Sequence, residues 1–201
     1  MIRVMIAEDV RLLRESLAAV LELEDDLTVV ATVERGDEIL DAATRARPDV
    51  ALLDIDLPGL DGISGAGQLR ERLPDCRTVI LTGLSRPGHL RRALAAGASG
   101  FLLKHSVPQT LIDAIRKIAA GERVVDPQLA LAALETPDSP LPAREIDVLR
   151  LAATGAGPDE IAATLFLSVG TVRNYLSSAI TRLDARNRVD AIRIATEQGW
   201  L

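Results

Sequence analysis

Short runs of aliphatic and β-branched residues alternate with helical patterns five times over the first 120 residues, and this alternation limits the possible folds most strongly. The segments between the runs are amphipathic. Leu13, Leu17, Val20 and Leu21, for example, have the spacing of one helix face. Alternating β and α units predict a parallel sheet that is covered by helices on both faces. The expected strands are residues 2–7, 27–33, 49–54, 77–81 and 99–103.

Five such units form a compact flavodoxin-like α/β domain, whose last helix is expected to end at Gly121. The stretch from Thr136 to Pro142 then breaks every regular pattern with three prolines. Pro158 suits the first turn of a helix, and Ser168 suits an N-cap. Four helices and no strand are expected after the break, at residues 143–154, 158–165, 169–183 and 188–198. The predicted organisation is an α/β domain at 1–122, a linker at 123–140 and a small all-α domain at 141–201.

Composition limits the compartment and the type of core. Apolar residues make up 48% of the 201 residues and aromatic residues only 2%, so aliphatic side chains must fill the cores. No apolar run approaches the roughly 18–20 residues that cross a bilayer, and the N-terminus lacks a signal-peptide pattern. The single cysteine, Cys76, has no partner for an internal disulfide and is expected to be a buried thiol. These features predict a cytoplasmic protein.

Charge is distributed unevenly along the chain. The formal net charge of −6 argues against an evenly spread affinity for nucleic acid. Within residues 173–193, however, five arginines face only Asp184 and Asp190, a local charge of +3. A basic stripe of this kind on a near-neutral module can bind DNA.

Acidic residues and one lysine follow the expected strands. Glu8 and Asp9 follow the first strand, Asp54 ends the third, and Lys104 follows the fifth. The carboxyl ends of parallel strands meet at one edge of a sheet, so these side chains are expected to share one pocket. At ~4 Å and an effective dielectric constant of ~20, each pair of carboxylates repels by ~4 kcal/mol. A divalent cation together with the lysine would relieve this repulsion, and such a site suits chemistry on phosphate.

The motifs Glu8-Asp9, Asp54 to Gly62, Thr82, and Phe101 with Lys104 resemble those of a response-regulator receiver domain over residues 1 to about 122. The resemblance implies that Asp54 is the phosphoacceptor. It further implies that Mg²⁺ is held by Glu8, Asp9, Asp54 and the backbone carbonyl of Asp56. Thr82 and Lys104 would contact the phosphoryl oxygens, and Phe101 would be the switch aromatic that rotates when Thr82 moves inward.

Other residues of these motifs have simpler expected roles. Asp61 and Gly62 are expected to form a turn. Many receiver domains carry proline after the lysine, in a cis peptide bond, whereas this chain has His105 there. A cis bond before a residue other than proline would cost ~3–4 kcal/mol.

Residues 138–201 resemble the LuxR-type helix-turn-helix domain of NarL/FixJ-family regulators. The matching segments are Arg144–Leu149, Glu160–Ala162, Ser168–Tyr175 and Arg182–Leu183. Two positions depart from the family pattern: Pro142 replaces the usual threonine and Asp184 replaces the usual glycine.

The third helix of this domain is the expected recognition helix. Val172, Leu176 and Ile180 would anchor it, and its other face would present Arg173, Asn174, Ser177 and Ser178. The resemblance makes Arg173, Asn174 and Ser177 the best candidates for base contacts in the major groove. Phosphate contacts are expected from Thr171, Arg182 and Arg188, and Ser168 completes the expected DNA-binding set.

The predicted protein is a two-component response regulator and not an enzyme. A sensor histidine kinase would phosphorylate Asp54, and the protein would then form a homodimer on double-stranded DNA. The first and last receiver helices are the candidate dimer faces, and Val189, Ile192 and Ala195 of the final helix would pair the DNA-bound copies. Residues 23–26, 86–88 and 170–175 are similar to those of DesR-type regulators.

Two alternatives stay open. The first is an atypical regulator that works without phosphorylation. The second is a haloacid-dehalogenase-like phosphatase, because Asp54-Ile55-Asp56 matches the paired aspartates of that family. That family places the motif on its first strand, whereas here it follows the third.

Overall fold

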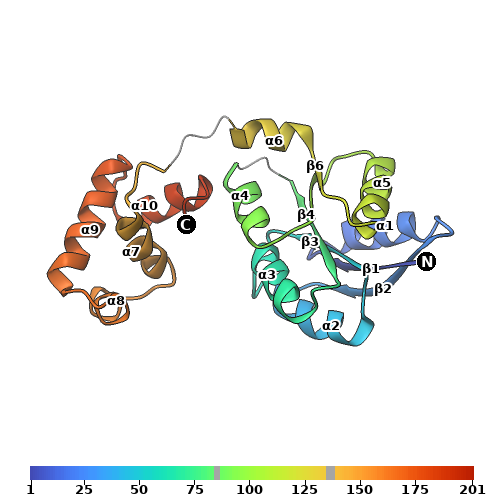
Figure 1. The fold of residues 1–201 in the computed structure, drawn as a ribbon, viewed down its shortest axis with the longest axis horizontal. Helices are drawn as coiled ribbons and strands as arrows, with labels where there is room; N and C mark the ends of the chain where they lie inside the picture. Colours follow the sequence, from blue (N-terminus) through green and yellow to red (C-terminus); the bar gives the residue numbers. More distant parts are fainter. Residues whose placement is uncertain (84–86, 135–138) are drawn as a thin grey trace. The chain divides into compact units, whose positions relative to one another are not determined.

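The computed structural model describes residues 1–83, 87–134 and 139–201 (Figure 1). The chain divides into two compact units, one made mainly of residues 1–132 and the other mainly of residues 139–201. Among the described residues, no helix has the length and apolar character needed to span a bilayer.

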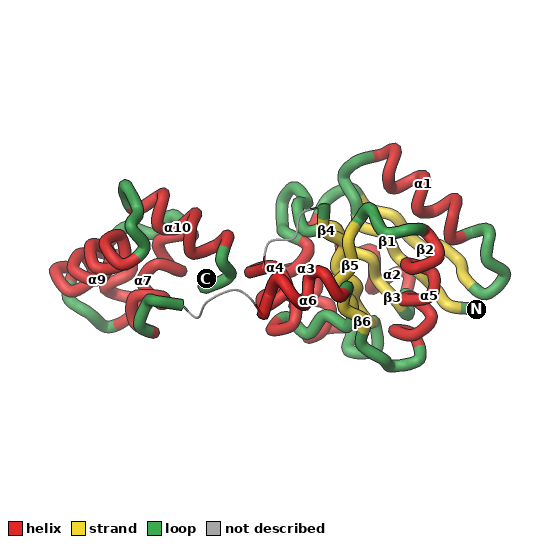
Figure 2. The backbone as a smooth tube through the Cα atoms, turned by 90° about the horizontal axis from the view of Figure 1, so that it is seen from above, coloured by secondary structure: helices red, strands yellow, loops and turns green. Residues whose placement is uncertain are grey.

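A parallel sheet forms the centre of the first unit (Figure 2). Its strand order is β2-β1-β3-β4-β5-β6, and every neighbouring pair is parallel. The five predicted strands are present, and the sixth is an addition. The strands are β1 (Ile2–Ala7), β2 (Leu27–Val33), β3 (Val50–Asp54), β4 (Arg77–Thr82), β5 (Gly100–Leu103) and β6 (Val124–Val125).

Helices cover both faces of this sheet, as the alternating pattern predicts. Successive residues of a strand point to opposite faces. Ile6 and Leu52 therefore pack with α1 and α5, whereas Leu53 faces α3 on the other side. The helices of this unit are α1 (Arg11–Leu21), α2 (Ile39–Ala46), α3 (Gly62–Arg72), α4 (Pro87–Ala95), α5 (Pro108–Ala119) and α6 (Pro127–Leu134), with a 3₁₀ turn at Gly36–Glu38.

Residues 123–134 contain regular structure, although the sequence places them in a linker. The backbone N–H of Val124 donates to the carbonyl of Ser99 at 3.0 Å, and the backbone N–H of Asp126 donates to the carbonyl of Phe101 at 2.9 Å. Both distances are typical of backbone hydrogen bonds. A strand of two residues is too short to show a period of two, so only its pairing with β5 reveals it. Residues 135–138 of the expected linker lie outside the described residues.

The second unit consists of four helices around an aliphatic core. These are α7 (Ala143–Ala153), α8 (Pro158–Leu165), α9 (Val169–Arg182) and α10 (Arg188–Glu197), and each lies within one residue of its predicted bounds. Their core includes Val148, Ile161 and Val172. The predicted four-helix arrangement is therefore confirmed.

Local sequence explains where these helices begin and end. The Ser168 hydroxyl accepts a hydrogen bond from the backbone N–H of Thr171 at 3.0 Å, so Ser168 caps α9 as predicted. Pro142 stands at the N-cap of α7 and provides no side-chain cap. Asp184, just beyond α9, has a left-handed backbone with φ of 49°. This conformation favours glycine, and aspartate is among the few other residues that tolerate it.

Candidate functional site

Strand register brings the predicted phosphate-site residues to one edge of the sheet. Ala7 at the end of β1 pairs with Leu53, so Glu8, which directly follows β1, lies beside Asp54 at the end of β3. Thr82 at the end of β4 pairs with Leu103, which directly precedes Lys104. Positions almost a hundred residues apart in the sequence therefore share one location.

Three carboxylates form a compact cluster there. Oxygen atoms of Glu8, Asp9 and Asp54 all lie within 4.8 Å of one another, with Glu8 and Asp54 buried and Asp9 exposed. Lys104 Nζ lies 2.8 Å from Glu8 Oε2 and 2.9 Å from Asp54 Oδ2. The lysine thus bridges the two buried acids, as expected from its place after the fifth strand.

The electrostatics of the cluster follow from burial and from this bridge. Burial raises the pKa of Glu8, the charge of Asp54 adds to the increase, and Lys104 offsets part of it. Burial alone would lower the pKa of Lys104, but its hydrogen bonds to Glu8 and Asp54 outweigh that effect and raise it. Lys104 therefore stays protonated, and one positive charge faces three carboxyl groups.

Arg14 is a site residue that the sequence reasoning missed. Its side chain is buried on α1, and Nη1 donates to the backbone carbonyl of Glu8 at 2.6 Å. Nη2 forms an ion pair with Glu34 Oε1 at 2.5 Å. Arg14 thereby holds the Glu8-Asp9 segment in place. A signal was present, because Arg14 lies seven residues before Leu21, on the apolar face of that helix.

The turn after β3 brings α3 close to Asp54. Asp61 is the N-cap of α3 and accepts hydrogen bonds from the backbone N–H groups of Ile63 and Ser64, each at 3.1 Å. At Gly62, a Cβ atom would lie 1.9 Å from the backbone oxygen of Asp54. Only glycine permits this approach. Asp61 and Gly62 therefore shape the turn, as predicted, and Asp56 is exposed beside it.

Thr82 and Phe101 complete the predicted set on the neighbouring strands. Both side chains are buried, and Phe101 is only 1% exposed. The backbone N–H of Lys104 donates to the Thr82 carbonyl at 2.8 Å, which joins the ends of β4 and β5. The described residues contain no cis peptide bond, so the Lys104–His105 bond is trans.

In the second unit, α9 presents the predicted base-contacting residues on one exposed face. Arg173, Asn174 and Ser177 are all exposed, whereas Val172 and Leu176 are buried in the core. Ser168 and Thr171 lie at the N-terminus of the same helix. A helix with this division of faces can enter the major groove of DNA.

The structure corrects the placement of Ser178. Its hydroxyl donates to Oε1 of the buried Glu145 at 2.7 Å, so Ser178 is directed toward α7 and is only partly exposed. Arg182 Nε lies 3.3 Å from the same Glu145 oxygen. Sequence reasoning missed Glu145, although it lies three and four residues before the buried Val148 and Leu149.

Ion pairs engage three of the five arginines in the basic stripe at residues 173–193. Asp190 accepts hydrogen bonds from Arg186 Nε at 3.1 Å and from Arg193 Nη2 at 2.8 Å. The Arg186 pairing, followed by that of Arg193, lowers the pKa of Asp190. Of the five arginines in this stripe, Arg173 and Arg188 are the two without an ion pair to any described residue. The free positive charge is thus concentrated at two positions.

Comparison with known proteins agrees with both units. Residues 4–116 match the family described as response regulator receiver domain, and residues 139–195 match bacterial regulatory proteins of the luxR family. The chain belongs to the response regulators that combine a receiver domain with a LuxR-type DNA-binding domain. It is therefore a two-component response regulator of the NarL/DesR type, a family of transcriptional regulators.

Relatives match along the whole chain. The chain is 43% identical over 201 residues to the uncharacterized transcriptional regulatory protein YvfU of Bacillus subtilis, covering 100% of both. It is 40% identical over 200 residues to the transcriptional regulatory protein DesR of the same organism, covering 100% of this chain and 99% of DesR. Among solved structures, the response regulator ChrA of a heme-sensing two-component system is 34% identical with a TM-score of 0.60, covering 100% and 98%. The RcsB–DNA complex is 25% identical with a TM-score of 0.68, covering 98% of each chain.

Proposed function

We propose that a sensor histidine kinase phosphorylates this regulator on Asp54, and that phosphorylation promotes homodimerisation and sequence-specific DNA binding in the cytoplasm. The observation that carries this proposal is the bridge from Lys104 to Glu8 and Asp54 within the acidic cluster. A fixed ammonium group beside a buried carboxylate prepares the site to receive further negative charge.

The donor set of the cluster fits Mg²⁺, which prefers hard oxygen ligands. The carboxylates of Glu8, Asp9 and Asp54 would hold it together with the backbone carbonyl of Asp56. When bound, Mg²⁺ would supply positive charge that offsets the charge of the phosphoryl group. An Asp54 carboxylate oxygen would form the new bond to phosphorus as the bond from phosphorus to the kinase histidine breaks. Lys104 and the Thr82 hydroxyl would contact the phosphoryl oxygens.

The phosphoryl group adds about −1.5 to −2 charges beside Lys104 and Thr82. We infer that Thr82 is then drawn toward Asp54 and leaves space at the end of β4. Phe101 is buried on the neighbouring strand, so it can rotate only when such space becomes available. This pair would convert a local change of charge into a change of the receiver surface.

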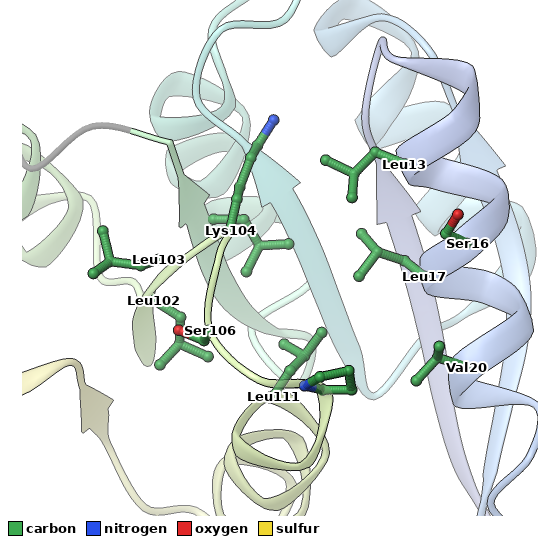
Figure 3. A pocket seen from close by; sticks show the side chains of 11 residues that line it. Leu13, Ser16, Leu17, Val20, Leu102, Leu103, Lys104, Ser106 and Leu111 are labelled. Atoms are coloured by element: carbon green, nitrogen blue, oxygen red, sulfur yellow. The ribbon is translucent and has the colours of Figure 1, made fainter.

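The first and last receiver helices, α1 and α5, are the proposed dimer faces. An apolar cavity of about 180 Å³ lies between α1 and the segment from β5 to α5. Figure 3 shows Leu13 and Leu17 of α1 pointing into it, with Leu111 of α5 below them. Leu12 and Val107 are large exposed apolar residues, and each is next in sequence to a residue that lines the cavity. Their burial by a second copy would favour association.

The second unit would engage DNA through α9. Arg173, Asn174 and Ser177 are proposed to contact bases, and Ser168, Thr171, Arg182 and Arg188 to contact the backbone. Helix α10 would serve two purposes, because Ala191 and Ala195 are buried in the core while Val189 is exposed. Val189 is thus available to pair with a second copy. Dimerisation raises the effective concentration of the second DNA-binding domain at its half-site.

The division into a receiver domain at 1–122, a linker at 123–140 and a DNA-binding domain at 141–201 remains our proposal. Within it, β6 and α6 would form a structured extension of the receiver. We propose no enzymatic turnover of phosphate esters, since the chain belongs to a family of transcriptional regulators.

The test is the variant Asp54→Asn, with Asp25→Asn as a matched control at an exposed acid. Each protein is incubated with acetyl phosphate and MgCl₂. Phosphorylation is then measured by intact mass, and association by light scattering. We expect wild type and the control to gain one phosphoryl group and dimerise, and Asp54→Asn to do neither. Dimerisation of Asp54→Asn equal to that of wild type would refute control through Asp54.

A further inference from the structure

Phe166 is the aromatic residue whose environment is unusual. The chain has only two phenylalanines, one tyrosine and one tryptophan. Phe101 is buried, and Tyr175 and Trp200 pack against the core of the second unit. Phe166 is 95% exposed. A side chain that could fill a core in this aromatic-poor protein instead lies almost wholly in solvent.

The backbone of Phe166 is unfavourable as well. Phe166 is the C-cap of α8 and has left-handed angles, with φ of 55° and ψ of 46°. A bulky residue rarely adopts this conformation, whereas glycine and asparagine tolerate it. Leu165 and Leu167 on either side pack against the core, so the turn directs only Phe166 outward. Local stability would favour asparagine here, and the phenylalanine therefore suggests a binding partner.

The position of Phe166 indicates what that partner is. It lies two residues before Ser168, the N-cap of α9. In helix-turn-helix proteins the N-terminal residues of the recognition helix contact base edges, so the preceding turn lies at the edge of the major groove. Residues 161–183 contain no acidic residue and two arginines, Arg173 and Arg182. This local charge suits a polyanion.

We propose that Phe166 is a DNA contact that packs against the C5-methyl group of a thymine at the edge of the half-site. The proposal rests on α9 being the recognition helix, as proposed above. The thymine methyl is the apolar group of the major-groove pattern, and phenylalanine is among the side chains that contact it. The contact would bury the exposed ring without adding charge, and would therefore contribute to base selection without changing the salt dependence of binding.

The variants are Phe166→Asn and Phe166→Ala in the full-length chain, with Leu23→Ala as a control at another exposed apolar residue. The probe is a duplex selected from a random pool by the wild-type protein. Affinity is measured by fluorescence anisotropy at two salt concentrations. Each thymine of the duplex is then replaced in turn by deoxyuridine, which lacks only the methyl group. Thermal unfolding of the second unit is followed through Trp200, the single tryptophan of the chain.

We expect both Phe166 variants to bind the duplex about tenfold more weakly than wild type, which corresponds to about 1.4 kcal/mol. The salt slope should be unchanged, and Leu23→Ala should bind like wild type. Deoxyuridine at one position per half-site should weaken binding by wild type and leave both Phe166 variants unaffected. Phe166→Asn should also raise the melting temperature, because asparagine fits the left-handed backbone. A folding defect would instead lower both stability and affinity.

Three outcomes would overturn the proposal. They are wild-type affinity of Phe166→Asn, a loss of affinity that no thymine position explains, and a loss of affinity that comes with a changed salt slope, which would indicate a phosphate contact. The variant Arg173→Ala tests the proposed recognition helix separately. If Arg173→Ala also binds like wild type, the assignment of α9 fails; if only the Phe166 variants do, the further inference alone fails.

Discussion

Replacing Arg14 by methionine tests how the acidic cluster is held in place. Methionine keeps most of the packing volume and the helix propensity but removes the guanidinium donors. The Arg14 hydrogen bond to the Glu8 carbonyl is 2.6 Å long and buried, and hydrogen bonds from charged groups contribute about 1.5–3 kcal/mol. The pair with Glu34 adds less than about 1 kcal/mol, because Glu34 is 67% exposed. We expect the free energy of unfolding of the first unit to fall by about 2–3 kcal/mol.

The same substitution should weaken Mg²⁺ binding, because Arg14 fixes the segment that carries Glu8 and Asp9. With MgCl₂ at tenfold its dissociation constant, ligand binding stabilises wild type by about 1.4 kcal/mol. If the dissociation constant of Arg14→Met is tenfold higher, the same MgCl₂ concentration provides only about 0.4 kcal/mol. The difference of about 1 kcal/mol separates a positioning role from a purely structural one, since a structural loss would be the same with and without Mg²⁺.

The assay is urea unfolding followed by circular dichroism, with and without MgCl₂, combined with calorimetric titration of MgCl₂. Trp200 fluorescence reports the second unit separately and should not change. Arg11→Met is the matched control, because Arg11 lies on the same helix but is 79% exposed. Arg14→Lys keeps the charge and should recover part of the affinity. If Arg14→Met binds Mg²⁺ as tightly as Arg11→Met does, Arg14 does not position the cluster.

Two further predictions concern other buried groups. Glu145→Ala removes the acceptor for Ser178 and Arg182 and should lower the stability of the second unit by about 1–3 kcal/mol, measured by urea unfolding through Trp200; an unchanged midpoint would contradict this role. Burial, together with the charge of Asp49, raises the pKa of Cys76 from 9.0 to about 12. At pH 8 the folded thiol should therefore react with a disulfide reagent at least about a thousandfold more slowly than in urea. Because folding raises this pKa, the protonated thiol's contribution to the free energy of unfolding should be fully present below pH 9 and should be lost as the pH rises toward about 12. Equal labelling rates in the folded and unfolded protein would refute the burial argument.

Sequence periodicity was sufficient for most of the secondary structure. The five longer strands are short apolar runs, typical of a parallel sheet covered on both faces, and the four C-terminal helices have a period of 3.6 residues. Both signals depend only on the local order of residues. β6 was missed because two residues define no period, and its hydrogen bonds come from β5. The same local logic predicted the cap at Ser168 and the turn at Asp61 and Gly62, because both depend on residues close in sequence.

Side-chain partners distant in the sequence were harder to predict. Ser178 was placed on the exposed face of α9 because helical spacing alone cannot show that Glu145, 33 residues away, lies beside it. The local charge of +3 already included Asp190, but it left out Glu145 and Glu197, which pair with Arg182 and Arg193 from outside residues 173–193. Arg14 was missed because its hydrogen bond to the Glu8 carbonyl forms only when the end of β1 and helix α1 come together in the fold.

The sequence by itself determined the alternation of elements, the strand-end positions of Glu8, Asp54 and Lys104, and the family to which the chain belongs. Each of these can be recognised from short stretches of neighbouring residues. Tertiary structure alone decided that Lys104 bridges two buried acids and that Glu145 binds Ser178 and Arg182 of α9. It also decided that Phe166 is exposed to solvent and not buried in a core. Each of these depends on how close distant segments come in space. Burial then sets the strength of the electrostatic interactions, because they weaken wherever water can reach the charges.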